Sequence, residues 1–344
     1  MSEFFIIRYA DRTWSVRTEV PLLGAWVDWA EPFAELSLPE DRPADIVIVR
    51  RELEPAPPGA RQVVLHGELP GLAWEEDGCL HVRGLESDAG YMWTREERRE
   101  GGGLLTLAYG PAMPDHEAAL DAFRVVRGLV CADSEFTGRS RAHMSVVARE
   151  GRAVAFVGDK GAGKTSFALS ILRADPSVAF LANDKAQVEP VGTSLRVHGL
   201  PLAAAVSIDS IPDVPEITLN SYSRIIENKV YLWPLQLASI LSRQCVPSAL
   251  LDLVCFCELD LRAASVIVGP IEPDEIADLI SGPVSQYTDR INPDWLIRHV
   301  YGTVPRRPPD ALTHARWVRL QGNPWTPSWP VVFNSLLVGR SSAC

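Results

Sequence analysis

The chain has 344 residues, of which 47% are hydrophobic and 22% are charged, which is typical of a globular protein long enough for two domains. Its formal net charge of −11 argues against a nucleic-acid partner bound mainly through phosphate neutralisation. The first residues lack the basic and apolar regions of a signal peptide, and no apolar run of about 18 residues occurs, so we expect a cytoplasmic protein without a membrane partner.

Residues 1–110 predict a smaller, β-rich α+β domain. Its short apolar runs are typical of strands, and clusters of proline and glycine between them are typical of turns. The predicted strands are residues 4–9, 45–50, 62–66, 79–83 and 104–108. No catalytic arrangement of side chains occurs in this segment, so we expect a domain for recognition or assembly.

Residues 111–288 predict a second domain that opens with a helix at Asp115. Leu120, Phe123, Val126 and Val130 form an apolar face of that helix. The following apolar runs, 144–148 and 153–157, predict a β-hairpin, and His143 stands at its head. The hairpin delivers the chain to a glycine-rich segment.

The glycine-rich segment fits the pattern G-x-x-x-x-G-K-[ST], with an apolar strand before it and a helical pattern after it, and therefore predicts a P-loop. Backbone N–H groups of such a loop suit phosphate oxygens, its lysine reaches the outer phosphates, and its threonine hydroxyl can bind Mg²⁺. The predicted nucleotide-binding residues are Gly158, Asp159, Lys160, Gly161, Ala162, Gly163, Lys164 and Thr165.

A second buried strand is predicted at residues 178–182, and it ends at Asn183 and Asp184. A carboxylate at the carboxyl end of a core strand beside a P-loop is suited to binding Mg²⁺ or to accepting a proton. Asp184 is therefore a candidate for both roles.

These features together resemble the catalytic domain of the HPr kinase/phosphorylase family. His143 lies fifteen residues before Gly158, and the sequence GDKGAGKT and the strand ending at Asn183–Asp184 follow at matching spacings. The resemblance covers roughly residues 115–270. It implies an α/β fold with a mixed-sheet core like that of phosphoenolpyruvate carboxykinase, ATP and Mg²⁺ as cofactors, and a tendency to form homo-oligomers. It also implies that Asp184 accepts the proton of a substrate hydroxyl, that Thr165 and Asp184 bind the metal, and that His143 and Lys164 complete the catalytic site.

The chain departs from that family at several positions. Asn183 stands where the family has an aspartate, so one carboxylate is replaced by an uncharged amide. The family's glycine-rich segment with a Mg²⁺-binding glutamate is replaced by residues 195–202, and the next acidic residue, Asp209, is a candidate substitute. The arginine-bearing loop associated with the reverse reaction has no match, which argues against that reaction and against HPr as the substrate.

The remaining segments predict structure more than chemistry. Residues 220–229 are either a lid, with Arg224 and Lys229 facing phosphate, or a solvated loop. Helices are predicted at 235–241, 249–251 and 273–280, and strands at 253–259 and 264–268. Residues 289–344 predict an extension rich in tryptophan and proline that packs on the core. The cysteines show no metal-binding spacing, so we expect reduced core thiols.

The sequence favours an ATP- and Mg²⁺-dependent kinase that transfers the γ-phosphoryl group to a hydroxyl of a peptide or small-molecule acceptor, including acceptors of natural-product or peptide tailoring. The alternative is a nucleotide-binding regulatory or scaffold protein with little turnover, which the amide of Asn183 favours. A GTPase is a third reading, and it lacks the guanine-reading N-K-x-D segment.

Overall fold

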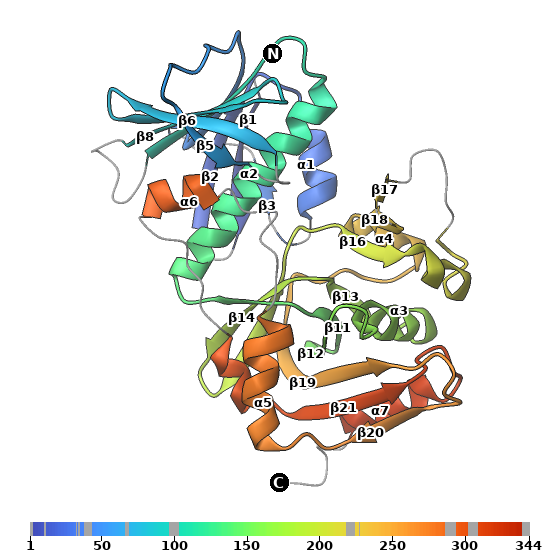
Figure 1. Cartoon of the computed structure of the whole chain (residues 1–344). Helices are drawn as coiled ribbons and strands as arrows, with labels where there is room; N and C mark the ends of the chain where they lie inside the picture. Colours follow the sequence, from blue (N-terminus) through green and yellow to red (C-terminus); the bar gives the residue numbers. More distant parts are fainter. Residues whose placement is uncertain are drawn as a thin grey trace. The chain divides into compact units, whose positions relative to one another are not determined.

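The computed structural model of the chain describes residues 3–9, 12–31, 33, 35–37, 43–65, 69–95, 103–217, 224–226, 228–285, 294–301 and 309–338. The chain forms two compact units, and Figure 1 labels many of their elements. The first comprises residues 1–30, 34–137 and 288–305, and the second comprises residues 31–33, 138–287 and 306–344. The fold is of the mixed α/β class. No helix among the described residues has the length and apolar character needed to cross a membrane.

The first unit is built on a nine-stranded sheet with the order β3-β1-β2-β4-β9-β8-β7-β6-β5. The central pairs β2–β4 and β4–β9 are parallel, and the other pairs are antiparallel. Its elements are β1 (Glu3–Tyr9), β2 (Arg12–Thr18), α1 (Leu23–Ala30), β3 (Glu35–Ser37), β4 (Ile46–Arg50), β5 (Arg61–Val64), β6 (Pro70–Glu76), β7 (Cys79–Gly84), β8 (Ala89–Arg95), β9 (Gly103–Tyr109), α2 (Asp115–Phe136) and α6 (Asp294–Tyr301). Among the described residues before position 110, nine strands and one helix are present.

Helix α2 packs in the first unit, whereas the sequence placed it at the start of the second domain. The Trp26 ring of α1 meets Phe123 of α2 edge-on at 5.6 Å. The hydroxyls of Tyr91 and Tyr109, on the sheet, both donate to the carboxylate of Asp121 on α2. These buried contacts join α2 to the preceding sheet, and so the compact units divide at residue 137 rather than at residue 110.

The second unit contains a larger mixed sheet and a small one. The large sheet has the order β10-β14-β15-β19-β12-β11-β13, and it continues from β19 through β21 to β20, while β16, β18 and β17 form the small sheet. Its elements are β10 (Ser140–Ala142), β11 (Ser145–Arg149), β12 (Arg152–Val157), α3 (Lys164–Ala174), β13 (Ala179–Ala182), β14 (Ala186–Val191), β15 (Ser194–Gly199), β16 (Ala204–Ser207), the 3₁₀ turn η2 (Ile208–Asp213), β17 (Arg224–Ile226), β18 (Lys229–Leu232), α4 (Pro234–Ile240), β19 (Ser248–Leu259), β20 (Val266–Gly269), α5 (Pro273–Leu279), the irregular turn η3 (Ile280–Val284), the 3₁₀ turn η4 (Asp310–His314), β21 (Trp317–Gly322) and α7 (Trp329–Val338).

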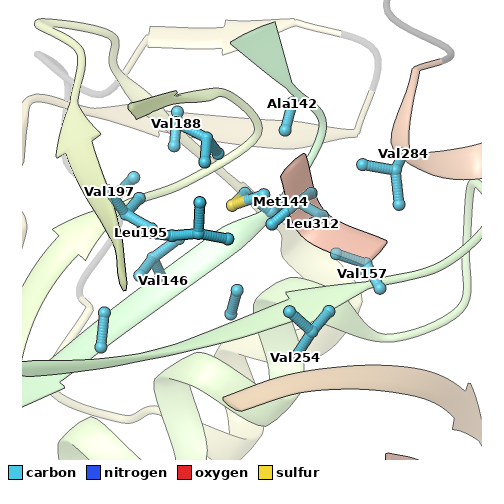
Figure 2. Close-up of a cluster of buried hydrophobic side chains, with 14 of the residues drawn as sticks. Ala142, Met144, Val146, Val157, Val188, Leu195, Val197, Val254, Val284 and Leu312 are labelled. Carbon is cyan, nitrogen blue, oxygen red and sulfur yellow. The ribbon is translucent and has the colours of Figure 1, made fainter. Parts of the chain in front are cut away.

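The large sheet buries apolar side chains on both faces. Figure 2 shows one cluster, in which Met144, Val146 and Val157 lie with side chains of β14, β15 and β19 and with Val284 and Leu312. On the opposite face Phe156 of β12 stacks on Phe167 of α3, and Trp329 of α7 meets Phe167 edge-on at 5.3 Å. Burial on both faces explains why the strands read as continuous apolar runs.

Two sequence predictions in this unit change. Residues 249–251 are not helical, because they belong to β19, which pairs with β12 and with β15. The segment 289–344 is not one extension, because its described parts divide between the units: α6 belongs to the first, while β21 and α7 belong to the second. Trp329 of this segment is fully buried.

Candidate functional site

Strand directions bring the candidate residues to one edge of the large sheet. Strand β11 is antiparallel to both β12 and β13, with Ser145 opposite Phe156 and Val146 opposite Ala182. The carboxyl ends of β12 and β13 therefore lie beside the start of β11. His143, the glycine-rich loop 158–165 and the pair Asn183–Asp184 all leave the sheet at this edge.

The glycine-rich loop turns tightly between β12 and α3. Gly158 and Gly163 have φ values of +145° and +90°, which L side chains rarely adopt. A Cβ at Gly158 would lie 2.9 Å from the Cβ of Ala162, and a Cβ at Gly163 would lie 2.8 Å from the Cβ of Leu259 at the end of β19. The loop thus requires glycine at these two positions, and the predicted order of strand, loop and helix is confirmed.

The lysine of the motif lies back over its own loop. The ammonium of Lys164 donates to the carbonyl of Gly158 at 2.8 Å and to the carbonyl of Asp159 at 3.0 Å. An ammonium has three N–H donors, so these contacts use two of them. Burial lowers the pKa of Lys164, and the charge of Lys229 lowers it further, whereas Asp184 and Asp159 act to raise it.

The threonine of the motif contacts the residue that directly follows strand β13. The Thr165 hydroxyl donates to Asn183 Oδ1 at 3.0 Å, and the Ser145 hydroxyl donates to the same oxygen at 2.8 Å. Asn183 is 6% exposed and Ser145 is 1% exposed. One amide oxygen, directly after β13, therefore accepts hydrogen bonds from a residue of β11 and a residue of α3. Ser145 is not among the residues predicted for the site, although it is the one polar residue in the apolar run 144–148.

Asp184 and His143 face one another at the same edge. His143 Nε2 lies 3.3 Å from Asp184 Oδ1, and the side chains are 19% and 48% exposed. The backbone N–H of His143 donates to the carbonyl of Val284 at 2.8 Å, which fixes the start of the hairpin. Partial burial acts to raise the pKa of Asp184, but the hydrogen bond from His143 and the charges of Lys185, His143 and Lys164 lower it on balance.

Asp184 also has an unusual backbone. Its φ is +68°, and the N–H of Lys185 donates to the carbonyl of Asn183 at 2.8 Å. This bond closes a γ-turn around Asp184, and the form with positive φ is the rarer and more strained one. Strained backbone persists where the surroundings impose it, and it is concentrated at functional sites.

Other candidates lie outside this group or are only partly described. The side chains of Asp159 and Lys160 are exposed. Asp209 is exposed and accepts a hydrogen bond from Asn228 at 3.0 Å. Residues 220–223 and 227 of the predicted lid lie outside the described residues. Among the residues that are described, no group of three or more His, Cys, Asp or Glu side chains is arranged to hold a metal.

Comparisons with known proteins add little to this geometry. No protein-family model matches the sequence, and no curated protein matches it. A solved structure of the Hpr(Ser) kinase/phosphatase from Coxiella burnetii is weakly similar, with a TM-score of 0.23 and 9% identity over 36% of this chain. The match spans 61% of that protein's chain. A likeness of this size is too slight to carry an argument about the fold or the function.

Proposed function

We propose that this chain is a kinase of the HPr-kinase-like class, which uses ATP and Mg²⁺ to phosphorylate a hydroxyl of a peptide or small molecule. The observation that carries the proposal is the meeting, at one sheet edge, of the glycine-rich loop with Lys164, Thr165 and the His143–Asp184 pair. Phosphoryl transfer depends mainly on positioning and charge neutralisation, and these groups can supply both.

The residues of the loop fit a nucleotide. Gly158 and Gly163 keep the backbone free of side chains, and the loop runs directly into the N-terminus of α3, where N–H groups favour anions. Bound ATP would supply the phosphoryl group, and Thr165 and Asp184 would bind Mg²⁺ through oxygen atoms. Mg²⁺ keeps several waters and phosphate oxygens as ligands, so a site of this kind needs few protein ligands.

The remaining steps belong to side chains of this chain. Lys164 would neutralise charge that develops on the transferred group. Asp184, ionised at neutral pH because its pKa is lowered, would orient the acceptor hydroxyl and take its proton as the oxygen–phosphorus bond forms. His143 would hold the Asp184 carboxylate in place.

The uncharged amide of Asn183 favours a second function, because it lies where a second carboxylate would strengthen metal binding. A nucleotide-binding regulatory or scaffold protein would use the same loop without transfer. The kinase predicts conversion of ATP to ADP that requires an added hydroxyl acceptor. The regulator predicts tight nucleotide binding without such conversion.

The test is the Lys164→Ala variant, with Arg173→Ala as the matched control. Arg173 is a cation at the other end of α3, where it bonds to Glu216 at 3.0 Å. We expect Lys164→Ala to lower acceptor-dependent transfer by about 10²–10³-fold or more, as loss of a charge-stabilising donor does, and Arg173→Ala to leave it unchanged. Transfer by the Lys164→Ala variant at the wild-type rate would refute the nucleotide site.

A further inference from the structure

Asn183 contacts both groups that the proposed reaction uses, and the inference drawn from it rests on the proposed function. Its side-chain oxygen accepts a hydrogen bond from Thr165, the proposed metal ligand. Its backbone carbonyl accepts the N–H of Lys185 and so closes the turn that presents Asp184. One buried residue therefore fixes the metal-binding hydroxyl through its side chain and the carboxylate through its backbone.

Ser145 supplies the second hydrogen bond to this amide. Met144 and Val146 belong to the apolar cluster of Figure 2. Side chains alternate along a strand, so Ser145 points to the opposite face, where α3 covers the sheet. Its hydroxyl is 2.8 Å from Asn183 Oδ1. A hydroxyl that is 1% exposed is costly unless it is bonded. Its described partner is Asn183.

The chemistry of the three groups sets the direction of the hydrogen bonds. An amide oxygen accepts and cannot donate, so both hydroxyls give their protons to Asn183. The lone pairs of Thr165 Oγ1 are then left for another electron-pair acceptor, and a divalent cation is the one that hydroxyl oxygens suit beside a nucleotide phosphate. Rotation of the amide would place its NH₂ group against both hydroxyls, which would then have to accept rather than donate. Without the Ser145 hydroxyl, only Thr165 holds the amide in its present orientation.

We propose that Ser145 and Asn183 are positioning residues that orient the Thr165 hydroxyl so that its lone pairs face Mg²⁺ in the nucleotide complex. The two residues do not touch the reacting atoms in this proposal. They act through Thr165, and the effect belongs to metal binding rather than to binding of the nucleotide phosphates by the loop.

The test compares ATP binding by titration calorimetry, with and without MgCl₂, in full-length variants. Ser145→Ala should reduce the Mg²⁺ enhancement of ATP affinity by about five- to tenfold, the value of one hydrogen bond, while metal-free ATP affinity stays within about twofold. Ser145→Thr retains the hydroxyl and should restore the enhancement. The matched control is Ser170→Ala: Ser170 is a buried serine of α3 whose hydroxyl donates to the Phe167 carbonyl at 2.9 Å, and its loss should change neither affinity.

The outcomes separate this inference from the proposed function. If the wild-type protein binds no ATP, or binds it equally with and without Mg²⁺, the proposed function fails and the inference fails with it. If wild type shows the enhancement and Ser145→Ala behaves as Ser170→Ala does, the inference alone is overturned. Should Ser145→Ala lose its folded circular-dichroism spectrum, Ser145→Cys replaces it. That variant has a similar size but is a weaker hydrogen-bond donor, so a reduced enhancement supports the proposal and an unchanged one refutes it.

Discussion

Replacing Asp184 by glycine and by alanine measures the strain in the backbone at the candidate site. Both substitutions remove the carboxylate, so the difference in their stability isolates the cost of holding φ at +68°. A side chain in the left-handed region costs about 1–2 kcal/mol, and glycine loses about 0.5–1 kcal/mol through its freer unfolded chain. We therefore expect Asp184→Gly to be more stable than Asp184→Ala by about 0.5–1 kcal/mol.

Urea unfolding followed by tryptophan fluorescence measures this difference, with Glu150 as the matched control. Glu150 is an exposed residue of the β11–β12 hairpin turn with φ of +53°, so Glu150→Gly should likewise be more stable than Glu150→Ala. Both Asp184 variants should lose phosphoryl transfer by about 10²–10⁴-fold, and both Glu150 variants should keep it. The strained turn would be refuted if Asp184→Gly and Asp184→Ala had the same unfolding free energy while Glu150→Gly was more stable than Glu150→Ala.

Two further predictions concern the second unit. Burial first, and then the charge of Arg139, lowers the pKa of His198 from 6.5 to about 4, so the unfolded chain binds its proton before the native protein does. The unfolding free energy should then fall by up to about 3 kcal/mol as the pH is lowered from 6.5 to 4. In His198→Asn the urea midpoint should depend less on pH over that window, and an unchanged pH dependence would contradict this cause. Trp329→Ala should cost about 3–5 kcal/mol of unfolding free energy, against less than about 0.5 kcal/mol for Val331→Ala on the exposed side of the same helix; equal urea midpoints would show that α7 is not part of the core.

Local patterns were enough to predict the elements around the candidate site. The apolar run 153–157, the glycine-rich loop and the helical spacing after Lys164 are short-range signals, and the structure has β12, the loop and α3 at those positions. The hairpin with His143 at its head and the strand ending at Asn183 are likewise present. Each of these depends on the few residues that form it.

Contacts between distant segments could not be read in this way. Helix α2 has an ordinary amphipathic sequence, and the hydrogen bonds of Tyr91 and Tyr109 to Asp121 show which sheet it covers. The turn at Asp184 carries no glycine to mark its positive φ. In the sequence, Asn183 is interpreted as the loss of a carboxylate. Its side-chain oxygen accepts a hydrogen bond from Ser145, which lies 38 residues earlier on another strand, and the local sequence does not show this contact.

The amide at position 183 changes the charge balance of the candidate site in a way that bears on the choice between kinase and regulator. With Asn183 uncharged, Asp184 has no carboxylate neighbour at position 183, and its pKa is lowered on balance by the hydrogen bond from His143 and the charges of Lys185 and Lys164, although burial opposes this. A second carboxylate next to it would repel it and raise the pKa of one of the pair. The single carboxylate therefore stays ionised without metal, and the ammonium of Lys164 is the cation of the loop that suits anionic phosphate. Such a site would bind nucleotide even where metal binding is weak, so affinity for ATP alone does not distinguish the two functions, and acceptor-dependent transfer does.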